Sequence, residues 1–273
     1  MSQFHNLVRK VVGEKETIPS HPIEDSPEGT ETIYTLQDVP VSRVMVDPAS
    51  RIVFHSDPQG AAAERFRLLR MRLRERRKAR KLKTLLITSP LPHDGKSTVA
   101  LNLATTLAEH GKRPVLLIEG DLHHSEILEH LGMGISAGFG QCLDQHLDPL
   151  SVIKRIEPLG WYFLPAGLPR ANATELLQTA TVDEILQNVG RYFDWVLIDS
   201  PPVLPLTDAL SLRQKADACL LVVRAGVTPR DAVDETVRLL GKENILGIVL
   251  NAVEGLERLY SRYGYYRPRS SPA

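Results

Sequence analysis

A Gly-Lys-Ser sequence at residues 95–97 is the feature of this chain that most directly suggests chemistry. It follows a short apolar run, Thr84–Ser89, and precedes a stretch to about His110 whose apolar residues recur with a helical period. A strand, a loop and a helix in this order are typical of a nucleotide-binding P-loop, whose backbone N–H groups and helix N-terminus face phosphate oxygens. The nucleotide-binding residues predicted on this basis are His93, Asp94, Gly95, Lys96, Ser97 and Thr98.

Two side chains of the loop have roles that follow from their chemistry. The Lys96 ammonium is expected to bind the β- and γ-phosphates of ATP, and the Ser97 hydroxyl is expected to hold Mg²⁺. The strict pattern has Gly where this chain has Pro90, and proline offers no N–H, so the donors are concentrated from Asp94 onward. An ordinary strand-to-helix turn that contains a lysine is the alternative.

Acidic residues follow two later apolar runs. Asp199 ends the run that starts at Trp195, and Glu119 and Asp121 follow the run Val115–Ile118. Ligands of a doubly wound sheet bind at the carboxyl ends of its strands, so these acids are expected to meet the loop. Asp199 and Asp121 are expected to hold Mg²⁺ with Ser97. Glu119 and Asp121 could also orient a hydroxyl or accept its proton during phosphoryl transfer. The predicted catalytic residues are therefore Lys96, Glu119, Asp121 and Asp199.

After Lys83, short β-rich runs alternate with helical stretches along the chain. The runs are nearly continuously apolar, as strands covered on both faces must be, and their connections are long enough for crossover helices. The sequence predicts an α/β fold with a doubly wound, mostly parallel sheet flanked by helices. Asn251, after the last run, is predicted either to contact the adenine or to serve as a structural amide. The predicted strands are 84–88, 115–118, 162–164, 195–198, 219–223 and 245–250.

Length and composition bound the class of protein. The 273 residues are 42% hydrophobic and 24% charged, which suits one large globular domain with tails. The longest apolar runs are far shorter than the ~20 residues that a membrane-spanning helix needs, and the first residues lack a secretory signal. Because Cys142 and Cys219 stand alone in the sequence, a cytoplasmic location is expected.

Four segments of the chain differ in composition. Residues 1–12 have the apolar spacing of a short amphipathic segment, and residues 13–58 are rich in proline and acids, as in a linker, with a strand expected at 51–54. Residues 59–255 form the predicted P-loop domain, which includes a basic helix over 61–80. Residues 256–273 are predicted to be a flexible, exposed tail of tyrosines and arginines.

The net charge of zero conceals a strongly basic segment. Residues 64–83 contain eleven Lys and Arg against two Glu, so their net charge is +9. Such a block favours an anionic partner, a screening surface or an interface between copies. The tail is also unusual, since four of its tyrosines lie among arginines, either as phosphoacceptors or as a stacking surface for nucleic acid. These tyrosines are Tyr260, Tyr263, Tyr265 and Tyr266.

Together these motifs resemble those of the bacterial tyrosine kinases of capsule and exopolysaccharide synthesis, a branch of the P-loop ATPases related to partitioning ATPases. The resemblance rests on residues 92–98, 116–123 and 195–202. It implies a tyrosine autokinase that uses ATP and Mg²⁺, in which Glu119, helped by Asp121, activates the tyrosine hydroxyl. The resemblance also implies that the tail tyrosines are the phosphoacceptors. It further implies a homo-oligomer held partly by Glu64, Arg67 and Arg70.

The chain is most similar to the split form of this family. That form is activated by a cytoplasmic segment of a membrane protein of polysaccharide chain-length control or export. The resemblance therefore implies a cytoplasmic protein held at the inner membrane by this partner, and a nucleic-acid partner is not expected. Three positions depart from the family pattern: Glu119 replaces the usual Asp, His93 the usual Gly and His123 the usual Arg. A catalytically weakened regulatory ATPase or nucleotide switch is therefore an alternative. A partitioning-type ATPase that binds DNA or membrane is a third, although Leu91 stands where that branch has a signature lysine.

Overall fold

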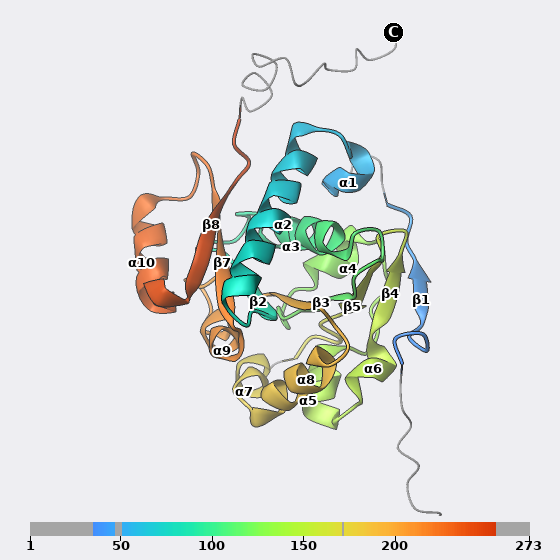
Figure 1. The fold of residues 1–273 in the computed structure, drawn as a ribbon. Coiled ribbons are helices and arrows are strands. Elements are labelled where there is room, and N and C mark those ends of the chain that lie inside the picture. Colours follow the sequence, from blue (N-terminus) through green and yellow to red (C-terminus); the bar gives the residue numbers. More distant parts are fainter. Residues whose placement is uncertain (1–34, 47–50, 171, 255–273) are drawn as a thin grey trace, which may run out of the picture. The chain divides into compact units, whose positions relative to one another are not determined.

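The computed structural model describes residues 35–46, 51–170 and 172–254, which belong to one compact unit that begins at Thr35. Within these residues one sheet has the strand order β1-β4-β5-β3-β6-β2-β7-β8 (Figure 1). Neighbouring strands are parallel except for β4 and β5, which are antiparallel. The strands are β1 (Val41–Arg43), β2 (Thr84–Thr88), β3 (Val115–Glu119), β4 (Lys154–Glu157), β5 (Trp161–Leu164), β6 (Trp195–Asp199), β7 (Ala218–Arg224) and β8 (Ile245–Asn251).

Helices lie between the strands along the chain and cover both faces of the sheet (Figure 1). Among the described residues, no helix is both long enough and apolar enough to span a bilayer. The helices are α1 (Val53–Ser56), α2 (Ala61–Ala79), α3 (Lys96–Ala108), α4 (Glu126–His130), α5 (Phe139–Gln145), α6 (Pro149–Val152), α7 (Ala173–Leu177), α8 (Ala180–Gly190), α9 (Asp208–Lys215), α10 (Arg230–Leu240) and a 3₁₀ turn at Lys242–Asn244.

The core has two halves, one on each face of the sheet. Alternate residues of β3 point to opposite faces, so Leu117 packs in one apolar cluster with Leu73 of α2 and Leu103 of α3. Its neighbour Ile118 packs in the other cluster, which includes Leu212 of α9. This double coverage explains why the central strands are nearly continuous apolar runs.

The strand register brings three loops to one edge of the sheet. Glu119, at the end of β3, pairs with Asp199, at the end of β6, and Asp199 pairs in turn with Ile87 of β2. The carboxyl ends of β2, β3 and β6 therefore lie side by side. The P-loop after β2 and the acidic residues after β3 and β6 thus share one edge, as expected for ligand binding in this class of sheet.

The predicted fold class is confirmed, and each of the six predicted strands is present. Two further strands, β1 and β4, were not predicted. The described part of the predicted linker contains β1 and α1, and the strand expected at 51–54 is wrong because Val53–Ser56 is helical. Asn102 of α3 accounts for that local shape, since its Oδ1 accepts from Val53 N at 2.8 Å and its Nδ2 donates to Arg51 O at 2.8 Å.

Candidate nucleotide-binding site

The backbone of the P-loop has two residues in the left-handed region, Gly95 and His93. Helix α3 begins at Lys96, and its cap residue Gly95 has a φ of 92°, in the left-handed region that favours glycine. A Cβ at Gly95 would lie 2.1 Å from Asn251 Nδ2, so a larger residue does not fit there. His93 also has a positive φ, 66°, which gives a physical reason why glycine is common at that position in the family that the motifs resemble.

Two side chains fasten this loop to the rest of the sheet. Asn251 Nδ2 donates to Asp94 O at 2.9 Å. Asp94 is itself buried, and its carboxylate accepts from Leu91 N at 3.1 Å and from Thr228 Oγ1 at 2.6 Å. Asn251 therefore acts as a structural amide in this structure, and its predicted contact with adenine stays a prediction. The N–H groups at the start of α3 belong to the first turn of a helix, which makes them candidate phosphate donors.

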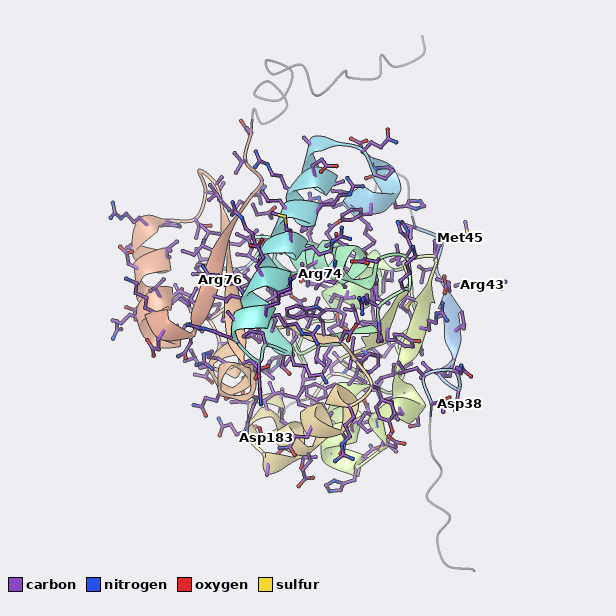
Figure 2. The ribbon with its side chains drawn as sticks, in the orientation of Figure 1. Asp38, Arg43, Met45, Arg74, Arg76 and Asp183 are labelled. Carbon is purple, nitrogen blue, oxygen red and sulfur yellow. The ribbon has the colours of Figure 1, made fainter. Side chains whose placement is uncertain are left out.

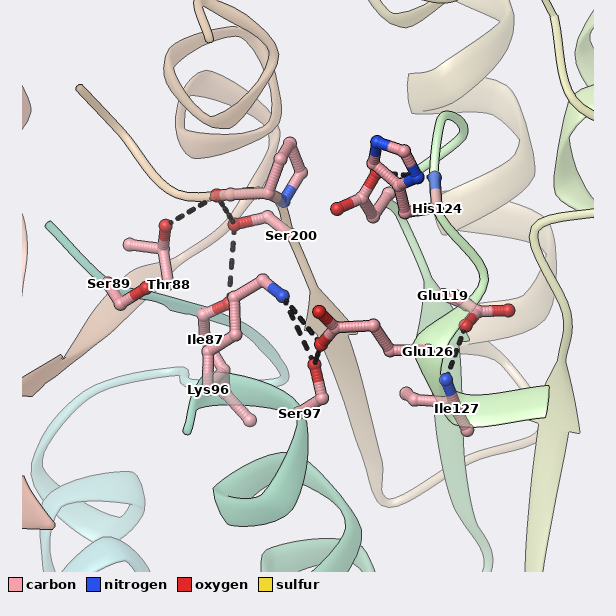
Figure 3. A network of polar contacts seen from close by, with 12 residues as sticks. Ile87, Thr88, Ser89, Lys96, Ser97, Glu119, His124, Glu126, Ile127 and Ser200 are labelled. Carbon is pink, nitrogen blue, oxygen red and sulfur yellow. Dashed lines mark hydrogen bonds and ion pairs between the residues drawn. The ribbon is translucent and has the colours of Figure 1, made fainter. Parts of the chain in front are cut away.

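Lys96, Ser97 and Glu126 form a compact polar cluster at the N-terminus of α3 (Figure 3). Lys96 Nζ lies 3.2 Å from Ser97 Oγ and 3.1 Å from Glu126 Oε2. Ser97 Oγ donates to the same Glu126 oxygen at 2.7 Å. Lys96 and Ser97, predicted as the phosphate and Mg²⁺ ligands, are thus adjacent and buried, and a carboxylate from α4 contacts both of them.

The charge of Lys96 is stabilised despite its burial. Burial by itself lowers the pKa of the ammonium, but the nearby carboxylates of Asp199, Glu126 and Asp121 outweigh that effect and raise the pKa above its ordinary value. Lys96 is therefore a cation at neutral pH. A buried cation beside a helix N-terminus is an anion-binding arrangement.

Asp199 carries the most informative atom of the site. It is buried, and among the described residues its Oδ1 has no hydrogen-bond partner. Burial raises the pKa of Asp199 to about 7, against the opposing effects of the Lys96 ammonium and the Ser97 hydroxyl. An unpartnered buried oxygen is costly, so its presence beside Lys96 and Ser97 marks a place for a ligand.

These residues fit Mg²⁺ carried by a nucleotide. Mg²⁺ is usually bound through one or two carboxylates together with substrate phosphates and water. Asp199 and Ser97 supply suitable oxygens. The described residues contain no group of three or more His, Cys, Asp or Glu side chains that could hold a metal by themselves, so the ion would depend on the phosphates for further ligands.

The two acids after β3 differ in their surroundings. Asp121 Oδ1 accepts from the N–H groups of His123, at 3.2 Å, and His124, at 3.0 Å, so both bonds use one oxygen. Glu119 is 1% exposed, and each of its oxygens accepts a backbone N–H, from Ile127 at 2.8 Å and from Ala166 at 3.1 Å. Burial raises the pKa of Glu119 to about 7, although both N–H groups oppose that shift. Glu119 thus lies beside the site with its carboxylate engaged by the backbone.

Some residues of the site were missed by sequence reasoning. Glu126 had no expected role, and neither did the buried Asp208, which accepts from Thr174 Oγ1 at 2.6 Å and lies 3.0 Å from His123 Nε2. This network ties the segment after β3 to α7 and α9. Asp208 follows Thr207 and is the first residue of α9. Acids are common in the first turn of a helix, so no local pattern in the sequence indicated a further role.

The residues predicted for oligomerisation lie on α2, away from the loop. Arg67 Nη1 pairs with Glu64 at 2.5 Å, and Arg70 Nη1 donates to Thr106 O of α3 at 3.0 Å. All three line a groove of about 1110 Å³ along α2. Arg74 and Arg76 mark the same helix in Figure 2, and Arg74 pairs with Glu109 at the end of α3. The four tail tyrosines lie outside the described residues.

Comparison with known proteins gives the site a context. The putative tyrosine-protein kinase EpsB of Ralstonia nicotianae is 31% identical over 84% of this chain and 32% of its own length. The tyrosine-protein kinase YwqD of Bacillus subtilis is 29% identical over 79% of this chain and 90% of its own length. No protein-family model matches the chain.

Among solved structures, the kinase domain of a tyrosine kinase is also similar to this chain. The kinase domain of the Escherichia coli tyrosine kinase ETK is 25% identical and superposes with a TM-score of 0.71, covering 81% of this chain and 85% of the kinase domain. The chain belongs to the bacterial tyrosine kinase family. Within that family it spans about a third of the length of EpsB and most of the length of YwqD.

The chain also has the fold of a septum site-determining protein. The septum site-determining protein MinD of Pyrococcus horikoshii, solved with Mg-ADP, is 22% identical with a TM-score of 0.53 over 63% of this chain and 72% of MinD. At that identity the likeness shows the fold alone. It agrees with the predicted fold class.

Proposed function

We propose that the chain is a Mg²⁺- and ATP-dependent protein-tyrosine kinase that phosphorylates its own C-terminal tyrosines and regulates polysaccharide synthesis or export. The observation that carries the proposal is the juxtaposition of Lys96, Ser97 and Asp199 at the carboxyl edge of the sheet, with one Asp199 oxygen unpartnered among the described residues. The names of the relatives supply the reaction class.

Each side chain has a part in the proposed transfer. Lys96 and the N–H groups at the start of α3 would bind the β- and γ-phosphates and hold them in line for attack. Ser97 and Asp199 would hold Mg²⁺, which when bound neutralises charge on the phosphates. The tyrosine oxygen would attack the γ-phosphorus, the bond from the γ-phosphorus to the β,γ-bridging oxygen would break, and ADP would leave. The tyrosine proton would pass to a carboxylate.

The proton acceptor is proposed to be the acid pair after β3. Glu119 has both oxygens on backbone N–H groups, whereas Asp121 uses only Oδ1 for its two backbone bonds. Asp121 is therefore the better placed of the two to accept the tyrosine proton. Glu119 would then position the segment that carries Asp121.

The partners belong to the same proposal. We infer that a cytoplasmic segment of a membrane protein of polysaccharide chain-length control or export activates the kinase and brings it to the inner membrane. The groove along α2 and its arginines suit a contact between copies, since Arg–carboxylate pairs fix geometry. In such a homo-oligomer, the tail of one copy, with Tyr260, Tyr263, Tyr265 and Tyr266, would reach the site of the next.

Phosphate mapping tests the proposal. The full chain is incubated with Mg²⁺ and ATP, with and without a peptide from a candidate membrane partner, and phosphate is located by mass spectrometry. Phosphate on the tail tyrosines of the wild-type chain that is absent in Lys96→Met supports the proposal. Phosphate that persists in Lys96→Met, or none in any sample, contradicts it.

A regulatory ATPase or nucleotide switch is the second candidate. The hydrogen bonds of Glu119 favour it, because both oxygens of this predicted base already accept backbone N–H groups. In the same experiment this function gives nucleotide binding or ATP turnover without phosphotyrosine, even with the activating peptide.

A further inference from the structure

The carboxylate of Glu126 lies at the position where a phosphate group is expected. Glu126 begins α4, and its Oε2 accepts from both Lys96 Nζ, at 3.1 Å, and Ser97 Oγ, at 2.7 Å (Figure 3). These are the two groups assigned above to the phosphates and to Mg²⁺. A carboxylate is an anion with oxygen acceptors, as a phosphate is, so Glu126 makes the contacts that a nucleotide would make.

Glu126 and a nucleotide cannot use the same donors at once. A second anion placed within hydrogen-bond reach of Lys96 would lie close to the Glu126 carboxylate, and like charges repel strongly at such separations in a partly buried site. Glu126 already forms an ion pair with Lys96, since its Oε2 lies 3.1 Å from Lys96 Nζ.

The side chain has a route out of the site. Its exposed fraction is 43%, against 7% for Lys96. Rotation of the Glu126 side chain toward solvent would release Lys96 and Ser97 without a change of fold. A charged side chain that has access to water loses less on leaving than a fully buried one would.

We propose that Glu126 is an internal anion that occupies the phosphate position and lowers the affinity of the chain for nucleotide. The inference rests on the proposed function, since it assumes that phosphates bind at Lys96. A nucleotide whose phosphates contact Lys96 must displace Glu126, so the free energy of the Glu126 contacts is subtracted from the free energy of binding.

The position of Glu126 also links nucleotide binding to the acids after β3. The next residue, Ile127, donates its N–H to Glu119 Oε1 at 2.8 Å. The contacts of Glu126 with Lys96 and Ser97 help to hold the first turn of α4, so their loss would loosen the turn that holds Glu119. Hydrogen exchange at the Ile127 amide reports this link independently of catalysis.

The test compares nucleotide affinities of the full chain and two substitutions of Glu126. Binding of fluorescent ADP and of AMP is measured with Mg²⁺ for wild type, Glu126→Gln and Glu126→Ala, and folding of each variant is checked by thermal melting. Glu129→Gln is the matched control, because Glu129 is an exposed acid on the same helix. AMP lacks the β-phosphate that Lys96 is expected to bind.

The expected result is ADP binding about fivefold tighter in both Glu126 variants, equivalent to about 1 kcal/mol, with Glu129→Gln unchanged. AMP binding should change less than ADP binding. In wild type, ADP should speed exchange of the Ile127 amide, whereas in Glu126→Ala it should have a smaller effect.

Two results would overturn the inference. If wild type binds ADP and the Glu126 variants bind it equally or more weakly, Glu126 does not compete with phosphate, while the proposed function stands. An equal gain in Glu129→Gln would assign the effect to general charge and not to this contact. If no chain binds ADP at all, both the inference and the proposed function are wrong.

Discussion

The ends of β3 and β6 carry acids that match in type and register but differ in what surrounds them. Glu119 and Asp199 are paired across the sheet, are 1% and 2% exposed, and each has its pKa raised to about 7, first of all by burial. Both oxygens of Glu119 accept backbone N–H groups. Asp199 Oδ1 has no partner among the described residues.

This difference separates a structural acid from a ligand-binding one. The N–H groups that satisfy Glu119 come from α4 and from the segment after β5, so this carboxylate joins three parts of the fold. Asp199 instead lies beside Lys96 and Ser97 and keeps an oxygen for a ligand. Burial and charge are shared by both acids, and hydrogen-bond satisfaction is what distinguishes them.

The largest expected effect is a loss of ADP affinity when Lys96, the neighbour of Asp199, is replaced. Lys96→Met removes the buried cation that neighbours Asp199, and we expect ADP affinity measured by calorimetry to fall at least about 100-fold. Lys112→Met, which removes an exposed lysine beyond the other end of α3, is the control and should bind normally. Equal binding by wild type and Lys96→Met would place the nucleotide elsewhere.

Glu119→Gln tests the claim that the Glu119 carboxylate stabilises the fold. Gln has one acceptor oxygen, so either the Ile127 or the Ala166 N–H loses its partner and faces an amide NH₂. The free energy of unfolding in urea should fall by about 2 kcal/mol without nucleotide. The exposed Glu129→Gln is the control. An unchanged unfolding free energy would mean that the backbone bonds of Glu119 do not hold the fold together.

Asp199→Asn should have the opposite effect on stability. Burial disfavours the ionised carboxylate, and an amide of the same shape removes that cost. We expect Tm without nucleotide to rise by a few degrees, equivalent to about 1–2 kcal/mol. If Asp199→Asn instead lowers Tm, and Glu119→Gln lowers it by a similar amount, the two acids have the same role and the distinction between them is lost.

The pH dependence of stability should show the smallest effect. Because the pKa of each acid is raised in the folded state, the folded chain holds protons that the unfolded chain releases between about pH 4 and pH 7. These two groups therefore make the unfolding free energy fall as pH rises through that window. Asp199→Asn should flatten this fall in urea titrations with EDTA, and a steeper fall would contradict the assignment.

Local sequence signals were sufficient for much of the fold. The P-loop and the central strands could be predicted because each is a continuous segment with its own pattern. Strands β1 and β4 were missed because each is only three or four residues long, with no buried residue in β1 and a single one in β4, so neither forms an apolar run. The helix at Val53–Ser56 depends on Asn102, 49 residues away from Val53, and no local pattern reports such a contact.

The site was predictable in composition but not in its hydrogen bonds. The sequence places Lys96, Asp121 and Asp199 at one edge, and the structure brings them together. The partner of Glu119 at Ala166 lies 47 residues away, so the engagement of that carboxylate could not be predicted. Nor does any local signal tell which glutamate of α4 contacts the loop, since Glu126 and Glu129 are both acids in its first turn.

The most direct test of the account is the Mg²⁺ dependence of ADP binding in Asp199→Asn and Glu119→Gln, measured by calorimetry with Mg²⁺ and with EDTA. The account predicts that Mg²⁺ tightens binding about tenfold in wild type and in Glu119→Gln but has no effect in Asp199→Asn. An Asp199→Asn variant that responds to Mg²⁺ as wild type does would contradict the central claim that Asp199, beside Lys96 and Ser97, holds the metal of a bound nucleotide.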